Sequence, residues 1–96
     1  MSKYLKTYID LLNCYLMKKI SSDKFYEDFS KLFYKKTLKP LNDIEFAIID
    51  ELWGWLDTYE PNPKIRKGAE DIYLNKKQLY NKVKEYKEKI NRLIKK

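Results

Sequence analysis

Histidine is absent from this 96-residue sequence, and cysteine and glycine are rare, with one and two residues respectively. Without histidine the chain lacks the commonest general base and the commonest metal ligand of proteins. The single cysteine, Cys14, can form neither an internal disulfide nor a cysteine-based zinc site, and we interpret it as a small buried apolar residue. Two glycines are too few for a P-loop or a dinucleotide-binding fingerprint. The sequence therefore predicts no enzymatic activity, no cofactor and no metal ion, with paired carboxylates as the one catalytic option left open.

Long apolar runs are lacking as well. The longest uncharged run, Leu11 to Met17, is far shorter than the roughly 20 residues that a membrane span needs. The N-terminus reaches Asp10 without the apolar core and cleavage site of a secretory signal. With 36% charged and 44% apolar residues, the chain is expected to fold as one soluble, cytoplasmic domain over residues 1–96.

The positive charge is unevenly distributed along the chain. The net charge is +7, and 19 of the 21 basic residues are lysine. Residues 76–96 contain nine basic and two acidic residues, whereas residues 42–60 contain six acidic residues and no basic one. The location of the charge is thus more informative than its sum, and it singles out these two segments as candidate interaction surfaces.

Apolar residues recur every three or four positions in four segments, as on one face of a helix. The expected helices run from Leu5 to Ile20, from the N-cap Ser21 through Phe33, from the N-cap Asn42 to about Tyr59, and from the N-cap Asn75 through Leu93. Asn42 with Glu45, and Asn75 with Gln78, have the spacing of capping boxes.

Prolines separate the second, third and fourth of these segments. Pro40 disfavours helical geometry just before Asn42, and Pro61 and Pro63 are expected to end the third helix. Residues 60–74 then form the longest connection. Because strand and hairpin signals are missing, the sequence predicts an all-α protein folded as an antiparallel four-helix bundle.

The third helix separates acidic and apolar residues onto different arcs at about 100° per residue. Asp43, Asp50 and Asp57 recur every seven residues, spanning about 21 Å at roughly 1.5 Å per residue. We call these three residues the acidic row. The core arc of the same helix contains Ile48, Ile49, Leu52, Leu56 and Tyr59.

Small and aromatic residues border the acidic row. Ala47 and Gly54 share its arc and would let a partner approach closely, and Trp53 and Trp55 lie on opposite borders. The alternative is an ordinary solvated face with both tryptophan rings completing the core. The sequence leaves open whether each tryptophan belongs to the core or to an interface.

Three stretches resemble the immunity proteins of colicin D type: Asp50–Trp53, Asp57–Pro63 and Asn75–Leu79. The turn at Lys19–Phe25 is also similar to that family, so the resemblance covers nearly the whole chain. Members of the family are four-helix proteins of about this length. They bind the nuclease domain of a cognate bacterial toxin and block its active site.

The resemblance implies a toxin-binding surface at the end of the third helix and in the following loop. Asp57 and Glu60 match acidic positions of the family, whereas Asn62 stands where another acid is common, and the net charge here is basic rather than acidic. We therefore expect a monomer that inhibits the nuclease domain of a cognate toxin. The expected partner-binding residues are Asp43, Asp50, Trp53, Asp57, Tyr59, Glu60 and Asn62.

Two other functions stay open at this point. Residues 76–96, with their charge of +7, would suit a protein that binds nucleic acid or an anionic membrane. Mixed charges along that helix and the scarcity of arginine argue against nucleic acid, which we do not expect as a partner. An immunity protein against a membrane-acting bacteriocin would also be small, basic and helical.

Overall fold

The computed structural model describes residues 3–34, 41–69 and 71–94, which contain five α-helices. The four long helices are α1 (Lys3–Leu16), α2 (Ser22–Phe33), α3 (Asp43–Leu56) and α5 (Lys76–Ile94). The remaining helix, α4 (Pro63–Arg66), is a single turn between α3 and α5. These residues contain no strand, and only one isolated bridge joins Tyr59 to Leu74. The all-helical prediction is confirmed, but the predicted number of helices is one too small.

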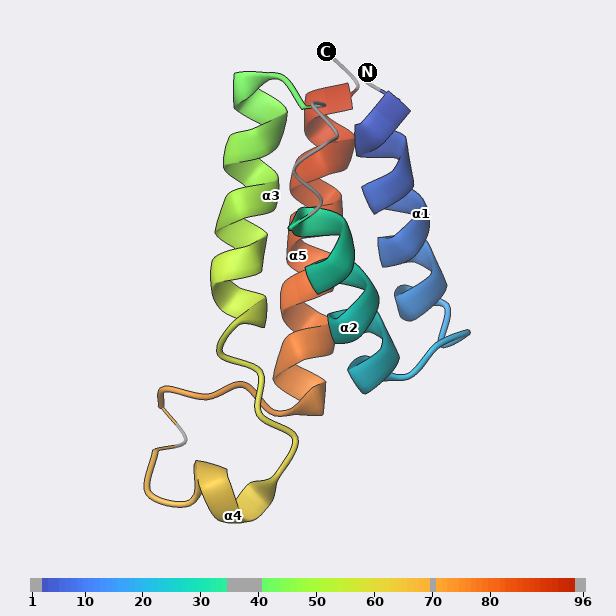
Figure 1. The fold of residues 1–96 in the computed structure, drawn as a ribbon. Helices are drawn as coiled ribbons and strands as arrows, with labels where there is room; N and C mark the ends of the chain where they lie inside the picture. The colour runs from blue at the N-terminus through green and yellow to red at the C-terminus, as the bar shows by residue number, and fades with distance from the viewer. Residues whose placement is uncertain (1–2, 35–40, 70, 95–96) are drawn as a thin grey trace.

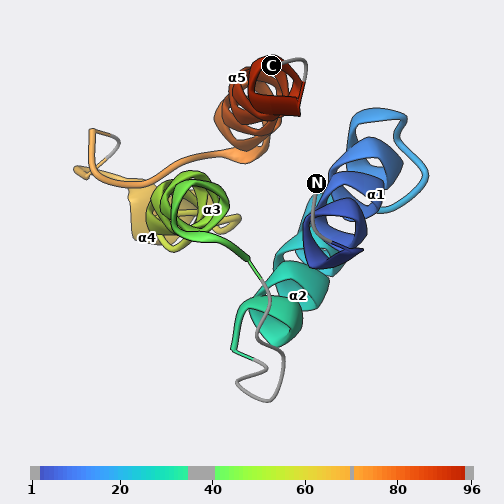
Figure 2. The ribbon, with the colours of Figure 1, turned by 90° about the horizontal axis from the view of Figure 1, so that it is seen from above.

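The long helices lie alongside one another (Figure 1). The start of α1 and the end of α5 lie at one end of the molecule, and the connection that carries α4 lies at the other. Viewed from above in Figure 2, α1 lies beside α2, and α3 lies beside α5. Helix α5 packs against α1, α2 and α3, so it is the element around which the others assemble.

Each long helix contributes an apolar stripe to one core, as the spacing predicts. The buried core residues of these helices are Leu5, Tyr8, Leu12, Tyr15, Phe25, Phe29, Ile49, Leu52, Leu56, Leu79, Val83, Tyr86 and Ile90. The cysteine of α1, Cys14, is only partly buried at the edge of this core. Because α3 buries one arc in the core, the position of its opposite arc is fixed as well.

The predicted helix starts are confirmed by their capping hydrogen bonds. The Glu45 N–H donates to Asn42 Oδ1 (2.8 Å) and the Asn42 N–H donates to Glu45 Oε1 (3.1 Å). Asn75 and Gln78 form the same reciprocal pair, at 2.8 and 2.9 Å. Ser21 Oγ accepts from the Lys24 N–H at 3.1 Å. The predicted break at Pro40 lies outside the described residues.

Two helices end earlier than the periodicity predicts. Helix α1 stops at Leu16 rather than Ile20 because Lys18 adopts a left-handed conformation (φ 61°), and the Lys19 N–H then donates to the Cys14 carbonyl at 2.9 Å. Helix α3 stops at Leu56 rather than Tyr59, whose N–H bonds only three residues back, to the Leu56 carbonyl. In both cases the apolar spacing continues past a local turn that periodicity does not reveal.

Helix α4 was not predicted, although its signal is present in the sequence. Asn62 Oδ1 accepts from the Lys64 N–H at 2.9 Å, and Pro63 occupies the first helical position. Asparagine at the N-cap followed by proline is a favoured helix start, because proline lacks only an N–H that would be unpaired there. The sequence predicts that Pro63 ends the third helix, whereas in the structure it begins α4.

Candidate functional site: the acidic face of α3

The acidic row lies on the face of α3 that points away from the core. Ile49, Leu52 and Leu56 are fully buried, and this arc of the helix packs against α5. The spacing places Asp43, Asp50 and Asp57 on the opposite arc, and all three have exposed side chains. Asp43 lies in the first turn of α3, and Asp57 is its C-cap. The structure thus presents the three carboxylates along the full length of one helix.

No lysine or arginine neutralises the acidic row within the described part of the chain. The ion pairs there join Lys24 to Asp28, Lys31 to Glu27, Lys82 and Lys89 to Glu85, and Lys89 to Glu51. Among the described residues, no ion pair therefore offsets the negative charge of the row, although the protein as a whole is basic. Such a local field attracts a positively charged surface.

Small residues lie between the carboxylates. Ala47 and Gly54 are both exposed, and a Cβ built at Gly54 would meet no atom within 4 Å. The space above Gly54 is open, so its lack of a side chain does not serve packing inside the protein. A partner could bring its backbone or a flat side chain close to α3 at this point.

Trp53 lies at the border of the acidic row that faces α2. Its half-buried ring is stacked on Phe29, with centroids 6.0 Å apart, and on Phe33 at 5.4 Å. Tyr26 is also in contact, at 5.8 Å. Trp53 therefore fills the space between α2 and α3 and still exposes part of its surface.

Trp55 lies at the opposite border and connects α3 to α5. Its indole N–H donates to Tyr86 Oη (3.1 Å), and the Tyr86 hydroxyl donates to Glu51 Oε1 (2.6 Å). Lys82 Nζ lies 3.9 Å from the centroid of the Trp55 ring. The hydrogen bond from Tyr86, with the nearby charge of Lys89, lowers the pKa of Glu51 below its ordinary value. These contacts give Trp55 a role in holding the two helices together.

Tyr59, one of the expected partner-binding residues, lies in the core at the end of α3. Its side chain is buried, and its hydroxyl donates to Asp23 Oδ1 on α2 at 2.7 Å. Tyr59 follows α3 by three residues, so this bond ties the end of α3 to the start of α2. The position of Tyr59 on the core arc of the third helix predicts this burial, whereas the resemblance to a family motif does not.

Glu60 and Asn62 are occupied by contacts within the loop. Glu60 Oε2 accepts from the Asn62 N–H at 3.1 Å, and Asn62 caps α4. The loop is closed at its base by two further bonds, from the Glu60 N–H to the Leu74 carbonyl (2.9 Å) and from the Leu74 N–H to the Thr58 carbonyl (2.8 Å). Both residues therefore shape the loop that adjoins Asp57.

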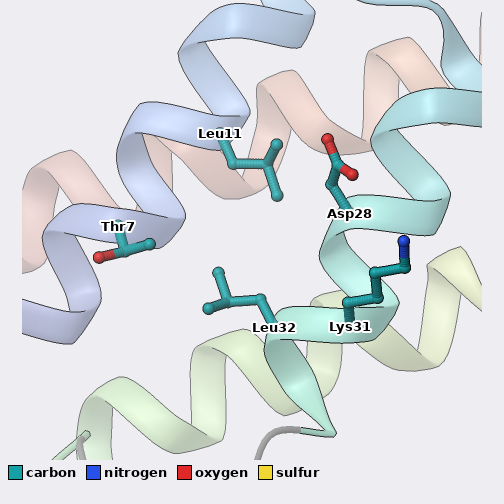
Figure 3. Close-up of a pocket in the computed structure, with 5 residues that line it drawn as sticks. All are labelled: Thr7, Leu11, Asp28, Lys31 and Leu32. Carbon is teal, nitrogen blue, oxygen red and sulfur yellow. The ribbon is translucent and has the colours of Figure 1, made fainter.

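A shallow groove lies between α1 and α2, on another part of the surface (Figure 3). Leu11 and Leu32 point toward each other across it, and Asp28 and Lys31 lie along α2 beside them. Both charges are paired within α2, to Lys24 and Glu27 respectively. The groove therefore offers a small apolar floor without a free charge to select a ligand.

A basic groove lies where the start of α5 meets the turn between α1 and α2. Lys18, Lys76 and Lys77 line it together with Tyr15 and Tyr80. It is open to solvent, and its lysines are on the surface. This groove, rather than the middle of α5, is where positive charge gathers around a hollow.

Residues 3–34, 41–69 and 71–94 offer neither a metal-binding cluster nor a membrane-spanning helix. This part of the chain has no cluster of three or more His, Cys, Asp or Glu side chains placed to hold a metal ion. None of its helices combines the length and apolar character needed to cross a bilayer. The acidic face of α3 is accordingly the surface on which charge, exposure and side-chain size point to a partner.

The buried tyrosines predict a loss of stability at alkaline pH. Burial raises the pKa of Tyr8 and of Tyr86 to about 12, and burial and the bond to Asp23 raise the pKa of Tyr59 as well. These phenols keep their protons in the folded protein, whereas in the unfolded chain they lose them near pH 10. Their contribution to stability is therefore complete below about pH 10 and is lost as the pH rises toward 12.

We expect the last part of the phenolate absorbance, from the buried tyrosines, to appear together with the loss of helical circular dichroism above about pH 10. The urea-unfolded chain serves as the control and should titrate smoothly around pH 10. Ionisation of all nine tyrosines before any loss of helix would contradict the burial of these three hydroxyls.

Comparison with known proteins identifies one matching family. The family model described as bacterial self-protective colicin-like immunity matches residues 2–93, which is nearly the whole chain. Neither curated proteins nor solved structures gave a match.

Proposed function

Because the chain belongs to the family of bacterial self-protective colicin-like immunity proteins, we propose that it binds a cognate toxin and covers a basic active site with the acidic row of α3. The protein acts as an inhibitor rather than an enzyme, and it does so as a cytoplasmic monomer. Residues 1–96 form one domain, in which α1, α2, α3 and α5 make an antiparallel four-helix bundle. The toxin is a nuclease domain.

The observation that carries the proposal is the unneutralised acidic row on a basic protein. Asp43, Asp50 and Asp57 are exposed on one face, and no basic side chain of the described residues pairs with them. A nuclease active site must be positive to hold phosphate groups, and a row of carboxylates can take the place of a phosphate chain there. The small residues Ala47 and Gly54 permit close contact with the walls of such a cleft.

Glu60 and Asn62 contribute to the same surface through the shape of the loop. Their mutual hydrogen bond and the closed base of the loop hold it beside the C-terminal end of α3. In the proposed complex the loop contacts the rim of the toxin cleft, while Asp50 and Asp57 face its centre.

The proposal is tested with the toxin encoded beside this gene. Co-expression of the two proteins should protect cells, and the purified C-terminal domain of that toxin should bind this chain with a 1:1 ratio. A domain with nuclease activity that is lost on binding supports the proposal. Protection against a short secreted peptide that permeabilises membranes, with no binding to a nuclease domain, would favour the membrane-acting alternative instead.

Association should be strongly dependent on salt. Raising the ionic strength from about 0.05 M to about 0.5 M shortens the screening length to about 4 Å, so attraction between the acidic row and a basic cleft no longer acts at a distance. We expect the association rate, measured by stopped-flow mixing, to fall at least tenfold over this range. A rate that is independent of salt would rule out charge attraction as the basis of recognition.

The rival function, binding of an anionic polymer or membrane through α5, has weaker support. Three of the α5 lysines are engaged inside the protein: Lys82 with Glu85 and Trp55, Lys87 with Asn91, and Lys89 with Glu51 and Glu85. These contacts lower the charge that α5 can offer to phosphates. Binding of nucleic acid at physiological salt, without binding of the toxin domain, would reverse this preference.

A further inference from the structure

An exposed group of aromatic rings lies beside the acidic row. We call Tyr26, Phe33, Tyr34, Phe46 and Trp53 the aromatic patch. Its rings are in mutual contact, with centroid distances of 5.4 Å for Phe33–Trp53 and Tyr34–Trp53, 5.8 Å for Tyr26–Trp53 and 6.2 Å for Phe33–Phe46. The patch therefore extends from α2 and its C-cap Tyr34 across to α3.

Two members of the patch face solvent to an unusual degree. Tyr34 is 59% exposed and Phe46 is 51% exposed. Single exposed apolar side chains are common and need no explanation, and Ile44, at 62%, is one of them. Tyr34 and Phe46 differ because both contact the half-buried ring of Phe33, and Tyr34 also contacts Trp53, so together these rings form a continuous apolar surface.

The patch and the acidic row share one stripe of α3. Phe46, Asp50, Trp53 and Asp57 follow one another at spacings of four, three and four residues, which places them side by side along the helix. Aromatic and acidic side chains therefore alternate on this border. In addition, Tyr26 has a raised pKa, caused first by burial and then by the negative charge of Asp57, as expected if the two side chains are neighbours.

The side chain that best matches this alternation of aromatic and acidic residues is arginine. An arginine guanidinium is planar, stacks on aromatic rings and pairs with carboxylates through a fork of N–H donors, whereas lysine offers only a point charge. A guanidinium seated on Phe46 or Trp53 would have Asp50 or Asp57 within one helical turn. Aromatic residues that are surrounded by polar ones and become buried on binding are also the residues that contribute most affinity in interfaces.

We propose that the aromatic patch is the anchor of the toxin interface and receives an arginine-bearing surface of the toxin, with Phe46 and Tyr34 as the main contacts. This inference rests on the proposed function and adds the chemistry of the partner and the residues that supply affinity. The acidic row attracts the toxin and sets its position, and the patch retains it.

The first test compares two exposed apolar residues of α3 that lie on opposite borders of the acidic row. Phe46→Ser should raise the Kd for the toxin domain encoded beside this gene by about 30-fold or more, and Tyr34→Ser by about 10-fold. Ile44→Ser, the matched control on the α5 side, should change it less than about threefold. Thermal unfolding of each variant confirms that it is folded, and Tyr34→Ser keeps the test valid should Phe46→Ser unfold.

The second test asks whether an arginine of the toxin contacts the aromatic patch. Each arginine of the toxin domain is replaced by lysine, and at least one such variant should lose about tenfold in affinity for the wild-type chain but little for Phe46→Ser. Such non-additivity indicates direct contact. Unchanged affinity for every arginine variant, or for both Phe46→Ser and Tyr34→Ser, would overturn the inference.

The outcomes separate this inference from the proposed function. If charge reversal in the acidic row abolishes binding while the aromatic variants bind normally, the proposed function stands and the anchor does not. If the toxin domain fails to bind the wild-type chain, the proposed function and the inference about the aromatic patch are both wrong. Sedimentation that shows a dimer dissociated by Phe46→Ser would mean that a second copy covers the patch, which also overturns the inference.

Discussion

Replacing both Asp50 and Asp57 by lysine should weaken toxin binding by about 3 kcal/mol or more, which is over a hundredfold in Kd. Close charge pairs in such interfaces couple by about 1.5 to 7 kcal/mol, and reversal adds repulsion to the loss of attraction. Both side chains are exposed and lie outside the core of α3, so the fold should be retained. Isothermal titration with the toxin domain measures the change directly.

The effect on stability should have the opposite sign, which distinguishes a binding role from a structural one. Asp57 is the C-cap of α3, where a negative charge opposes the helix dipole, and the last turn of α3 has no basic residue. Asp57→Lys should therefore raise the free energy of unfolding by a few tenths to about 1 kcal/mol. A residue that costs stability in the free protein and supplies affinity in the complex is selected for the complex.

Two acidic residues provide controls for this result. Glu88→Lys makes the charge change of one of these substitutions on the exposed side of α5 and should leave the affinity within about threefold. Asp43→Lys, two heptads from Asp57, should mainly slow association, as rim charges do. If the double variant of Asp50 and Asp57 binds normally and still protects cells, the acidic row is only a solvated face.

Truncating Tyr86 should give the largest loss of stability. Its side chain is 2% exposed between α3 and α5, so Tyr86→Ala should cost about 3 to 5 kcal/mol, the range for deletion of a large buried aromatic side chain. Tyr86→Phe keeps the ring but removes the hydroxyl that joins Trp55 to Glu51. It should cost only about 1 kcal/mol, because both partners are partly exposed and can bond to water.

Urea unfolding followed by circular dichroism measures these costs. Lys84→Ala, on the exposed side of α5, is the control and should change the free energy of unfolding by less than about 0.5 kcal/mol. A larger loss for Lys84→Ala than for Tyr86→Ala would mean that the register of α5 is wrong.

Helix starts and core stripes could be predicted from the sequence because both depend on interactions within a few residues. The capping boxes at Asn42 and Asn75 are local pairs, and the stripe containing Val83 and Tyr86 needs only helical spacing. The ends of the helices were predicted less accurately than their starts. They depend on backbone conformation at single residues such as Lys18, whose left-handed geometry no apolar pattern reveals.

The candidate site was only partly predictable for a similar reason. The exposure of Asp43, Asp50 and Asp57 follows from helical spacing, once the core arc of α3 is known. The burial of Tyr59 follows from the same spacing, but the partner of its hydroxyl, Asp23, lies 36 residues earlier in the chain and could not be predicted. The exposed rings of Tyr34 and Phe46 form a patch only because α2 and α3 lie across from each other, a tertiary fact that one sequence does not contain.

The closed base of the α3–α5 loop allows the loop to change in evolution without disturbing the helices. The two backbone bonds between residues 58–60 and Leu74 hold the ends of the loop together, so the chain between them does not determine the register of α3 or α5. Doubling the length of such a loop costs only about 0.6 kcal/mol in closure entropy. Insertions and substitutions from Pro61 to Tyr73 are therefore expected to arise in evolution at little cost in stability to the helices that present the acidic row.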